Sequence, residues 1–393
     1  MGSKHAAALA TGTIVVLTAI AAAAWLSGRW VLTAIPIGVL FGFFLHKGDL
    51  CGSSAFSQVV LSHDWSKVRG LWAAIVVSML GIAAGHLLGW IQLNPKPFMW
   101  AGVIVGGVVF GIGMVLAGGC VSGCLFKAGA GNLNSIAALL SMPFGIGLVT
   151  YGPLATWTKG LKGIRITAAD SGPVTLSTLT GLPFGLLALL IAGATIAALV
   201  VTRRRSEPAV AHDPEPAPSL LSHSWKPWQA GIAIGLLALP AYLSSAASGR
   251  NYPLGVTGGV LQTAVLVTDA PVRHVTAPPS TTAKPSAAEP APPKPAKKIV
   301  WWLVLLVGGV VGGSHLSARL SGQTRLLPKP PEEVLTAMLG GFLVGAGAAI
   351  AGGCVIGNIL SGIALMGVGA MLFAVVVVLT NWATTVVYLR GLR

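Results

Sequence analysis

Long apolar runs alternate with short polar breaks along nearly the whole chain. A transmembrane helix needs about 20 consecutive, mostly apolar residues, and the sequence contains nine or ten runs of that length. The expected spans lie at about residues 8–26, 30–46, 70–90, 100–118, 133–152, 181–202, 227–246, 299–316, 334–352 and 366–389. The first run follows Lys4 and is rich in alanine, so a cleaved signal peptide is the alternative interpretation for it. The pattern predicts an all-α polytopic membrane protein.

Two polar segments interrupt this pattern. The first, at 203–226, begins with three arginines and contains several prolines and acidic residues. The second, at about 272–298, is rich in proline, alanine, threonine and lysine. Such compositions stay extended or disordered. They predict a first membrane half at 1–202, a polar linker, and a second half at 227–393 that contains the Pro/Ala-rich loop.

The sequence repeats itself across these halves. Residues 106–124, GGVVFGIGMVLAGGCVSGC, align without gaps with residues 340–358, GGFLVGAGAAIAGGCVIGN, at an offset of 234. Ten of the nineteen positions are identical, and Cys120 falls on Cys354 while Cys124 falls on Asn358. Such self-similarity is typical of chains built from duplicated structural units.

A weaker match extends the repeat to four copies. Residues 38–53 align with 107–122, which places Cys51 on Cys120, and 252–259 occupies the corresponding place in the third quarter without a cysteine. Each copy would contain a glycine-rich span, a tight turn, a short segment and a return span. The short segments, too brief to cross a bilayer, are predicted to be re-entrant helices and lie at about 51–62, 120–131, 254–267 and 354–364.

The number of spans predicts how the halves relate to one another and to the membrane. With ten spans, five separate the starts of the two halves, so the halves are expected to be inverted. Inverted repeats with broken helices meeting near the midplane recur among transporters. The rule that positive residues stay inside predicts a cytoplasmic location for Lys4, Arg203–Arg205, Arg390 and Arg393.

Composition supports a membrane protein and excludes other classes. Charged residues make up 9% of the chain, against about a quarter in soluble domains. The net charge of +15 comes from 25 basic and 10 acidic residues, but no basic soluble domain exists, so we expect no nucleic-acid partner. Four cysteines in so apolar a chain do not form the disulfide framework of a small secreted domain.

The repeated position has the chemistry of an anion path. Glycine pairs end a span and open a short helix, which allows a sharp turn and exposes backbone N–H groups where the helix dipole favours an anion. Lysine in a membrane segment is a further candidate. The predicted path residues besides the cysteines are Gly118, Gly119, Gly352, Gly353, Gly255, Thr257 and Lys127.

The cysteines themselves are the main candidates. A single buried thiol is usually an inert packing group, but Cys51, Cys120 and Cys354 occupy the same slot of the repeat. A thiol is a weak donor with a polarizable surface, so it can hold a soft sulfur atom loosely enough to release it. Cys124 has no cysteine counterpart and is predicted to be a packing residue. His46, Lys47 and Asp49, just before Cys51, are expected to shape one mouth.

Three motifs resemble the YeeE/YedE family of sulfur-transport membrane proteins: GDLCGSSAF at 48–56, GGVVFGIGMVLAGGCVSG at 106–123 and GGFLVGAGAAIAGGCVIG at 340–357. The resemblance implies an hourglass-shaped protein that takes up thiosulfate across the bacterial inner membrane. It implies that Cys51, Cys120 and Cys354 relay the anion by transient S–H···S hydrogen bonds. A TusA-like sulfur carrier is an implied partner, and a branch of the family linked to selenium leaves the substrate open.

Two other functions would also use these cysteines. A transporter of copper(I) or mercury would also use thiolates, but metal relays usually offer paired cysteines or methionine clusters, and the chain has 8 Met. A membrane thiol oxidoreductase needs a close redox pair, and no Cys-x-x-Cys occurs. We therefore expect a transporter with no enzyme activity, no cofactor and no resident metal.

Overall fold

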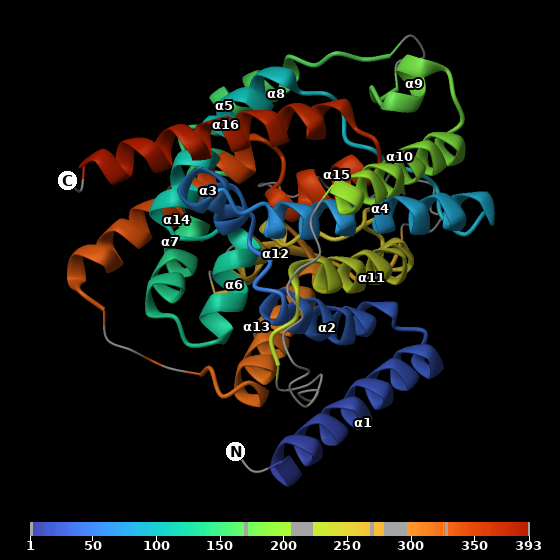
Figure 1. Ribbon diagram of the computed structural model, residues 1–393, viewed down its shortest axis with the longest axis vertical. Helices are drawn as coiled ribbons and strands as arrows, with labels where there is room; N and C mark the ends of the chain where they lie inside the picture. The colour runs from blue at the N-terminus through green and yellow to red at the C-terminus, as the bar shows by residue number, and fades with distance from the viewer. Residues whose placement is uncertain are drawn as a thin grey trace.

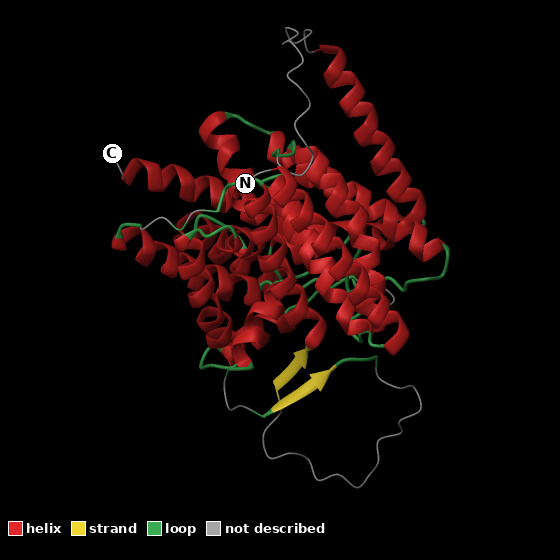
Figure 2. Ribbon diagram, turned by 90° about the horizontal axis from the view of Figure 1, so that it is seen from below, coloured by secondary structure: helices red, strands yellow, loops and turns green. Residues whose placement is uncertain are grey.

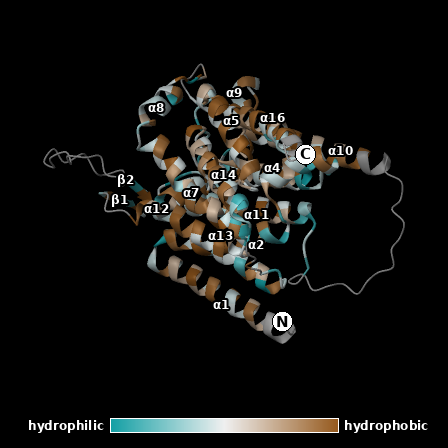
Figure 3. Ribbon diagram, turned by 90° about the vertical axis from the view of Figure 1, so that its left-hand side faces the viewer, coloured by the Kyte–Doolittle hydropathy of each residue, from teal (hydrophilic) through white to brown (hydrophobic). Residues whose placement is uncertain are grey.

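The computed structural model describes residues 3–168, 172–205, 223–267, 271–278, 297–324, 326 and 329–391. Helices account for most of this part of the chain (Figure 1), and hydrophobic residues recur along them (Figure 3). Within these described residues, ten helical runs are long and apolar enough to cross a membrane, which confirms the predicted all-α polytopic membrane protein. The long helices are α1 (Ser3–Ser27), α2 (Ala34–Lys47), α4 (Ser66–Leu87), α5 (Trp100–Leu116), α7 (Leu133–Thr150), α10 (Phe184–Arg205), α11 (Pro227–Ala247), α13 (Trp301–Leu320), α14 (Pro331–Ile350) and α16 (Val368–Gly391).

Short helices lie at all four places where the sequence predicts them. They follow α2, α5, α11 and α14 in the chain, each after a break in the helical backbone. Their bounds are α3 (Gly52–Ser62), α6 (Val121–Gly129), α12 (Thr257–Val265) and the pair η2 (Val355–Leu360) and α15 (Ser361–Ala364). The segment η2 is a π-helix rather than an α-helix. That these helices turn back inside the bilayer stays a prediction.

The long helices of the two sequence halves pack against one another rather than within separate bodies. α2 lies on α13 and α4 on α11, α5 and α7 both pack on α14, and α5 also packs on α16. By their order in the repeat, α2 corresponds to α11, α4 to α13, α5 to α14 and α7 to α16. When each helix is replaced by its counterpart, the α2–α13 contact becomes α11–α4, the α7–α14 contact becomes α16–α5, and α5–α14 is unchanged. This is the pairing that any two-fold relation between the halves requires. The repeat and the inversion of the halves in the membrane stay predictions.

Glycines allow these helices to approach within backbone contact. In the α2–α13 pair, a Cβ at Gly313 would overlap the carbonyl of Val39, and a Cβ at Gly42 would overlap the carbonyl of Val310. Close packing of small residues holds transmembrane helices together where the hydrophobic effect between them is absent. The neighbouring Gly312 is exposed and has no atom within 4 Å of its Cβ position.

Replacement of these two adjacent glycines by alanine is expected to have opposite effects on stability. Gly313→Ala pushes a methyl group into the Val39 backbone, and overpacking costs about 1–3 kcal/mol. Gly312→Ala meets open space and improves helix propensity by up to about 1 kcal/mol. The measurement is the thermal unfolding midpoint in detergent, which should fall for the first variant and hold or rise for the second. Equal midpoints would show that the two helices do not meet at Gly313.

Some elements were not expected from the sequence. They are the turn η1 (Trp30–Thr33), the helices α8 (Ala155–Gly163) and α9 (Leu176–Thr180), and the strands β1 (Val272–Val275) and β2 (Lys297–Val300). The strands pair in parallel at one end of the molecule (Figure 2). They lie at the two ends of the stretch that was expected to be unstructured throughout, and residues 279–296 between them lie outside the described residues.

The polar linker also differs from the prediction at its edges. The α10 helix continues through Arg205, so the linker begins later than residue 203. At the other edge, Trp225 stacks on Phe44 with ring centroids 5.7 Å apart, and its N–H donates to the carbonyl of Lys47 over 2.8 Å. Residues 206–222 lie outside the described part. α1 lies along one edge of the bundle (Figure 1), and few of its described side chains are buried.

Candidate functional site

Each of the three predicted path cysteines is the residue immediately before a short helix. Cys51 precedes α3, Cys120 precedes α6 and Cys354 precedes η2, all three with extended backbone at the N-cap. Val256 occupies the same place before α12. The three thiols are free and at most 1% exposed. The slot that the repeat assigns to the cysteines therefore corresponds to one structural position.

This position places a thiol beside unpaired backbone donors. The carbonyls of Cys51, Cys120 and Cys354 accept the first helical hydrogen bonds, over 2.9, 2.8 and 2.8 Å. The N–H groups of the first helical turn have no partner inside their own helix, and the helix dipole makes that end positive. A thiol flanked by such donors is suited to an anion that carries a soft atom.

Glycines make the turns before two of these cysteines. Gly118 and Gly352 have φ of 64° and 76°, a left-handed conformation that glycine adopts at little cost. Gly119 packs against Cys124, since a Cβ there would lie 3.1 Å from the Cys124 Sγ. Gly353 has no room for a side chain either, because a Cβ there would lie 2.6 Å from the Asn358 Oδ1.

Cys51 and Cys120 lie together at one side of the α6 helix. Their thiols are near enough to influence each other's ionisation, and the Cys120 Sγ is 3.3 Å from the Ser122 Oγ. The missing side chain of Gly123 makes room for them. A Cβ at Gly123 would overlap the Cys51 Sγ and lie 3.6 Å from the Cys120 Sγ.

A small enclosed cavity joins Cys51 to the segment that follows Cys354. It has a volume of about 10 Å³ and is lined by Cys51, Gly52, Val355 and Ile356 among other, mainly apolar residues. That volume is about one water probe. Gly52 is close to Val355, whose nearest methyl carbon would lie 2.8 Å from a Cβ at that position. The predicted path between the cysteines is thus closed in this structure.

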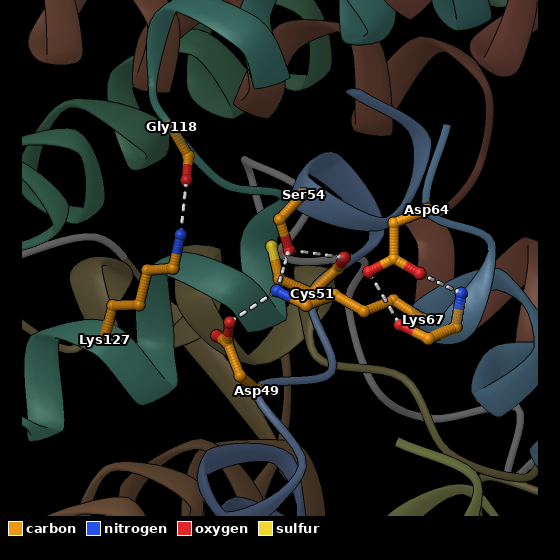
Figure 4. Close-up of polar contacts among 8 residues, drawn as sticks. Asp49, Cys51, Ser54, Asp64, Lys67, Gly118 and Lys127 are labelled. Atoms are coloured by element: carbon orange, nitrogen blue, oxygen red, sulfur yellow. Dashed lines mark hydrogen bonds and ion pairs between the residues drawn. The ribbon is translucent and has the colours of Figure 1, made fainter. Parts of the chain in front are cut away.

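The end of the predicted path next to α6 is open and positively charged. We call it the α6 end. A cavity of about 600 Å³ lies there. Its charged or titratable lining residues are His46, Lys47, Asp49, Lys67, Lys127 and Lys329. The carboxylate of Asp49 is paired with Lys67 over 2.5 Å, while the Lys127 ammonium donates to the carbonyl of Gly118 over 2.7 Å (Figure 4). Lysine charge therefore exceeds acidic charge around this opening, which favours anions.

The opposite end, which we call the Cys354 end, has a different cation. Lys96, in the loop between α4 and α5, donates to the carbonyls of Gly352 and Gly357 over 2.8 and 3.2 Å and to the Asn358 Oδ1 over 2.8 Å. The same ammonium would lie 2.8 Å from a Cβ at Gly353. The adjoining cavity holds only about 20 Å³. This end is closed by Lys96.

Burial is the main influence on the ionisation of Lys96. Burial, with a smaller contribution from the Arg250 guanidinium, lowers the pKa of the Lys96 ammonium to about 7, and Cys354 acts in the opposite direction. Arg250 stacks on Tyr252 at 5.4 Å, and burial lowers the pKa of Arg250 to about 10. The Tyr252 hydroxyl donates to the carbonyl of Gly357 over 2.7 Å. Lys96 is therefore a cation that titrates near neutral pH.

The two predicted path residues of the third copy lie close to this end. Gly255 lies beside the Arg250 guanidinium, with a Cβ position 2.7 Å from Nη2. The Thr257 Oγ1 is buried and makes no hydrogen bond with the described residues. Sequence reasoning missed Lys96 and Arg250, because both lie in connections between spans. The only sequence signal was the isolated lysine in the stretch NPKPF at 94–98.

Comparison with known proteins identifies the family of the chain. A family model described as sulphur transport matches residues 47–383. The thiosulfate transporter TsuA of Spirochaeta thermophila is 29% identical over 91% of this chain and 99% of its own length. TsuA of Escherichia coli is 28% identical over 92% and 96%, and the probable transporter YedE of Salmonella typhimurium is 33% identical over 26% and 25%. The chain therefore belongs to the sulphur transport family, the YeeE/YedE family that its cysteine motifs resemble.

Proposed function

We propose that the chain takes up thiosulfate across the bacterial inner membrane, and that Cys51, Cys120 and Cys354 pass the anion along by transient S–H···S hydrogen bonds. The observation that carries the proposal is the shared position of the three buried thiols, each at the start of a short helix. The two TsuA relatives bear the name of thiosulfate transporters. Thiosulfate offers a soft terminal sulfur to a thiol and oxygens to N–H donors.

Desolvation explains why the path needs both kinds of group. Moving an ion out of water into an apolar interior without partners is prohibitively costly. The unpaired N–H groups at the helix starts and the positive helix dipole replace part of the lost hydration. A weak thiol contact leaves the anion free to move on, because conduction requires sites that release what they bind.

Uptake of a dianion also needs a driving force. A membrane potential of about 100 mV, negative inside, opposes each entering negative charge by about 2.3 kcal/mol. For a dianion the opposing free energy is roughly 4.6 kcal/mol, equivalent to more than a thousandfold concentration ratio. We infer either coupling to protons or rapid consumption inside by a TusA-like sulfur carrier. Uptake that is insensitive to membrane potential and to a pH gradient would contradict proton coupling.

The test is uptake of radiolabelled thiosulfate into bacteria that lack their own thiosulfate and sulfate uptake systems. Cells that express the chain should accumulate label, whereas cells with an empty vector should not. Excess unlabelled sulfate should fail to compete, because sulfate matches the charge and tetrahedral shape of thiosulfate but has oxygen in place of the terminal sulfur. Effective competition by sulfate would contradict a thiol relay.

Two alternative substrates are distinguished in the same cells. If a selenium-containing anion of the same shape is also a substrate, it should compete with labelled thiosulfate for uptake. If it is the substrate in place of thiosulfate, cells should accumulate it and not thiosulfate. For soft metals, the measurement is copper(I) accumulation, which thiolate ligands would support. The proposal predicts no copper(I) uptake above the empty-vector control. Metal uptake without thiosulfate uptake would replace the proposed function.

A further inference from the structure

Two ammonium groups bind corresponding carbonyl oxygens at opposite ends of the cysteine path. Gly118 and Gly352 are related by the 234-residue offset of the repeat, and both have a left-handed backbone. The Gly118 carbonyl accepts from Lys127 over 2.7 Å, and the Gly352 carbonyl accepts from Lys96 over 2.8 Å. In each of the two copies that match most strongly, the turn before the cysteine therefore accepts a hydrogen bond from one lysine.

The two lysines do not correspond in sequence. The offset of 234 places Lys127 on Ser361, whose hydroxyl instead donates to the carbonyl of Leu254 over 2.7 Å. Lys96 comes from the connection between α4 and α5, and reaches its carbonyl across 256 residues of sequence. Because the same contact is made from unrelated positions, duplication of the chain does not account for it. A functional requirement for a cation at each turn accounts for it.

The two sites differ in what surrounds the ammonium. Lys127 borders the open cavity of about 600 Å³ and donates to Gly118. Lys96 donates to Gly352, Gly357 and Asn358, which occupies all three of its N–H groups, and its cavity holds about 20 Å³. The Lys96 site thus has an ammonium group beside the corresponding turn, as the Lys127 site does, but the space next to it is closed.

We propose that Lys96 is the anion-binding residue of the Cys354 end, the counterpart of Lys127, and that its ammonium exchanges the three protein oxygens for oxygens of the transported anion when this end opens. The ligand is a small dianion that carries oxygens and a soft atom. Its oxygens bind Lys96, and its sulfur faces Cys354, which lies close enough to interact electrostatically with that ammonium. This inference rests on the proposed function and assigns a residue that the cysteine relay does not include.

Ionisation of Lys96 gives the site a pH signature. Its pKa is lowered to about 7, and the groups that face it are Arg250, Tyr252, Cys354 and Lys162. The Arg250 pKa of about 10 and the raised Tyr252 pKa keep both groups from titrating between pH 6 and 8. Lys96 is charged below its pKa and neutral above it, so anion affinity is highest at acidic pH. From pH 6 to 8 the affinity should fall roughly tenfold, as the charged fraction does.

A purely structural role gives different expectations. The Gly352 carbonyl lies just beyond the end of α14, and a cation near a helix C-terminus stabilises the helix. In that role Lys96 would change thermal stability without changing anion affinity. Removal of the Asn358 acceptor would also loosen the structure, whereas the proposal predicts that it frees the ammonium for the anion.

The experiment measures equilibrium binding of radiolabelled thiosulfate to the purified full chain in detergent, where membrane sidedness plays no part. The variants are Lys96→Gln, Lys96→Arg and Asn358→Ala, with Lys159→Gln as the control because Lys159 is an exposed lysine of α8. Lys96→Gln should weaken binding roughly tenfold or more at pH 6 and abolish the pH dependence. Lys96→Arg should bind with a flat pH profile, because arginine stays charged. Asn358→Ala should bind more tightly, and Lys159→Gln should match the wild type.

The outcomes separate this inference from the proposed function. If the wild type takes up thiosulfate in cells while Lys96→Gln keeps wild-type affinity and pH profile, the Lys96 assignment is wrong and the relay stands. If Lys96→Gln does not fold, the pH profile of Lys96→Arg and the affinity of Asn358→Ala test the assignment. Binding by Lys96→Arg that depends on pH, or weaker binding by Asn358→Ala than by the wild type, overturns it. A wild type that takes up no thiosulfate overturns the proposed function first.

Discussion

Thiosulfate uptake should fall to near the empty-vector background in Cys51→Ala, Cys120→Ala and Cys354→Ala, while Cys124→Ala transports normally. A hydrogen bond to a charged group contributes about 1.5–3 kcal/mol. Loss of one thiol that contacts the anion should therefore slow its passage by roughly 10- to 150-fold. All three thiols are at most 1% exposed and begin a short helix. The measurement is initial uptake rate, normalised to the amount of protein in the membrane.

Cys124 makes this a matched comparison. It is as buried as Cys120 and lies four residues further along the same segment, inside α6 rather than at its start. It packs on the turn at Gly119, so an alanine there tests loss of a buried thiol without loss of a helix-start thiol. Equal defects in all four variants would point to folding rather than passage. Normal uptake by all four would show that the cysteines are packing groups.

Gly123→Ala should reduce uptake as strongly as loss of Cys51, although it removes no thiol. The new methyl group would occupy the space of the Cys51 Sγ and lie beside the Cys120 Sγ. The Cys51 sulfur must then move, because the methyl group would overlap it, and it has little room to do so because the residue is 1% exposed. Displacement of the Cys51 thiol from its position should slow uptake to the same extent as its removal, roughly 10- to 150-fold.

Two controls separate a blocked path from a damaged fold. Gly147→Ala in α7 places a methyl group where no atom lies within 4 Å, and should transport normally. Gly357→Ala, at the position that the 234-residue offset relates to Gly123, would make only an ordinary contact at 3.7 Å with the Lys96 ammonium, so its defect should be milder. Wild-type uptake by Gly123→Ala would mean that the anion does not pass between Cys51 and Cys120.

The membrane fold and the cysteine slots could be predicted from the sequence because both depend on local patterns. Each span is a contiguous apolar run, and a helix in lipid satisfies its backbone hydrogen bonds within itself. The breaks before α6 and η2 coincide with glycine pairs that the repeat displays directly at Gly118–Gly119 and Gly352–Gly353. The strands β1 and β2 were missed because a parallel pair forms between segments distant in the chain, with no local signal in a stretch rich in proline and alanine.

The sequence by itself determined that the chain is a multi-pass membrane protein and that three cysteines occupy equivalent positions. Only the tertiary structure decided which groups meet at those positions. Cys51 reaches Cys120 because Gly123 of another segment leaves room for its sulfur, and Lys96 closes the Cys354 end by contacts that span 256 or more residues of sequence. Periodicity and spacing describe a segment's own backbone, whereas the charge beside an anion path comes from whichever loop the packing of distant helices brings there.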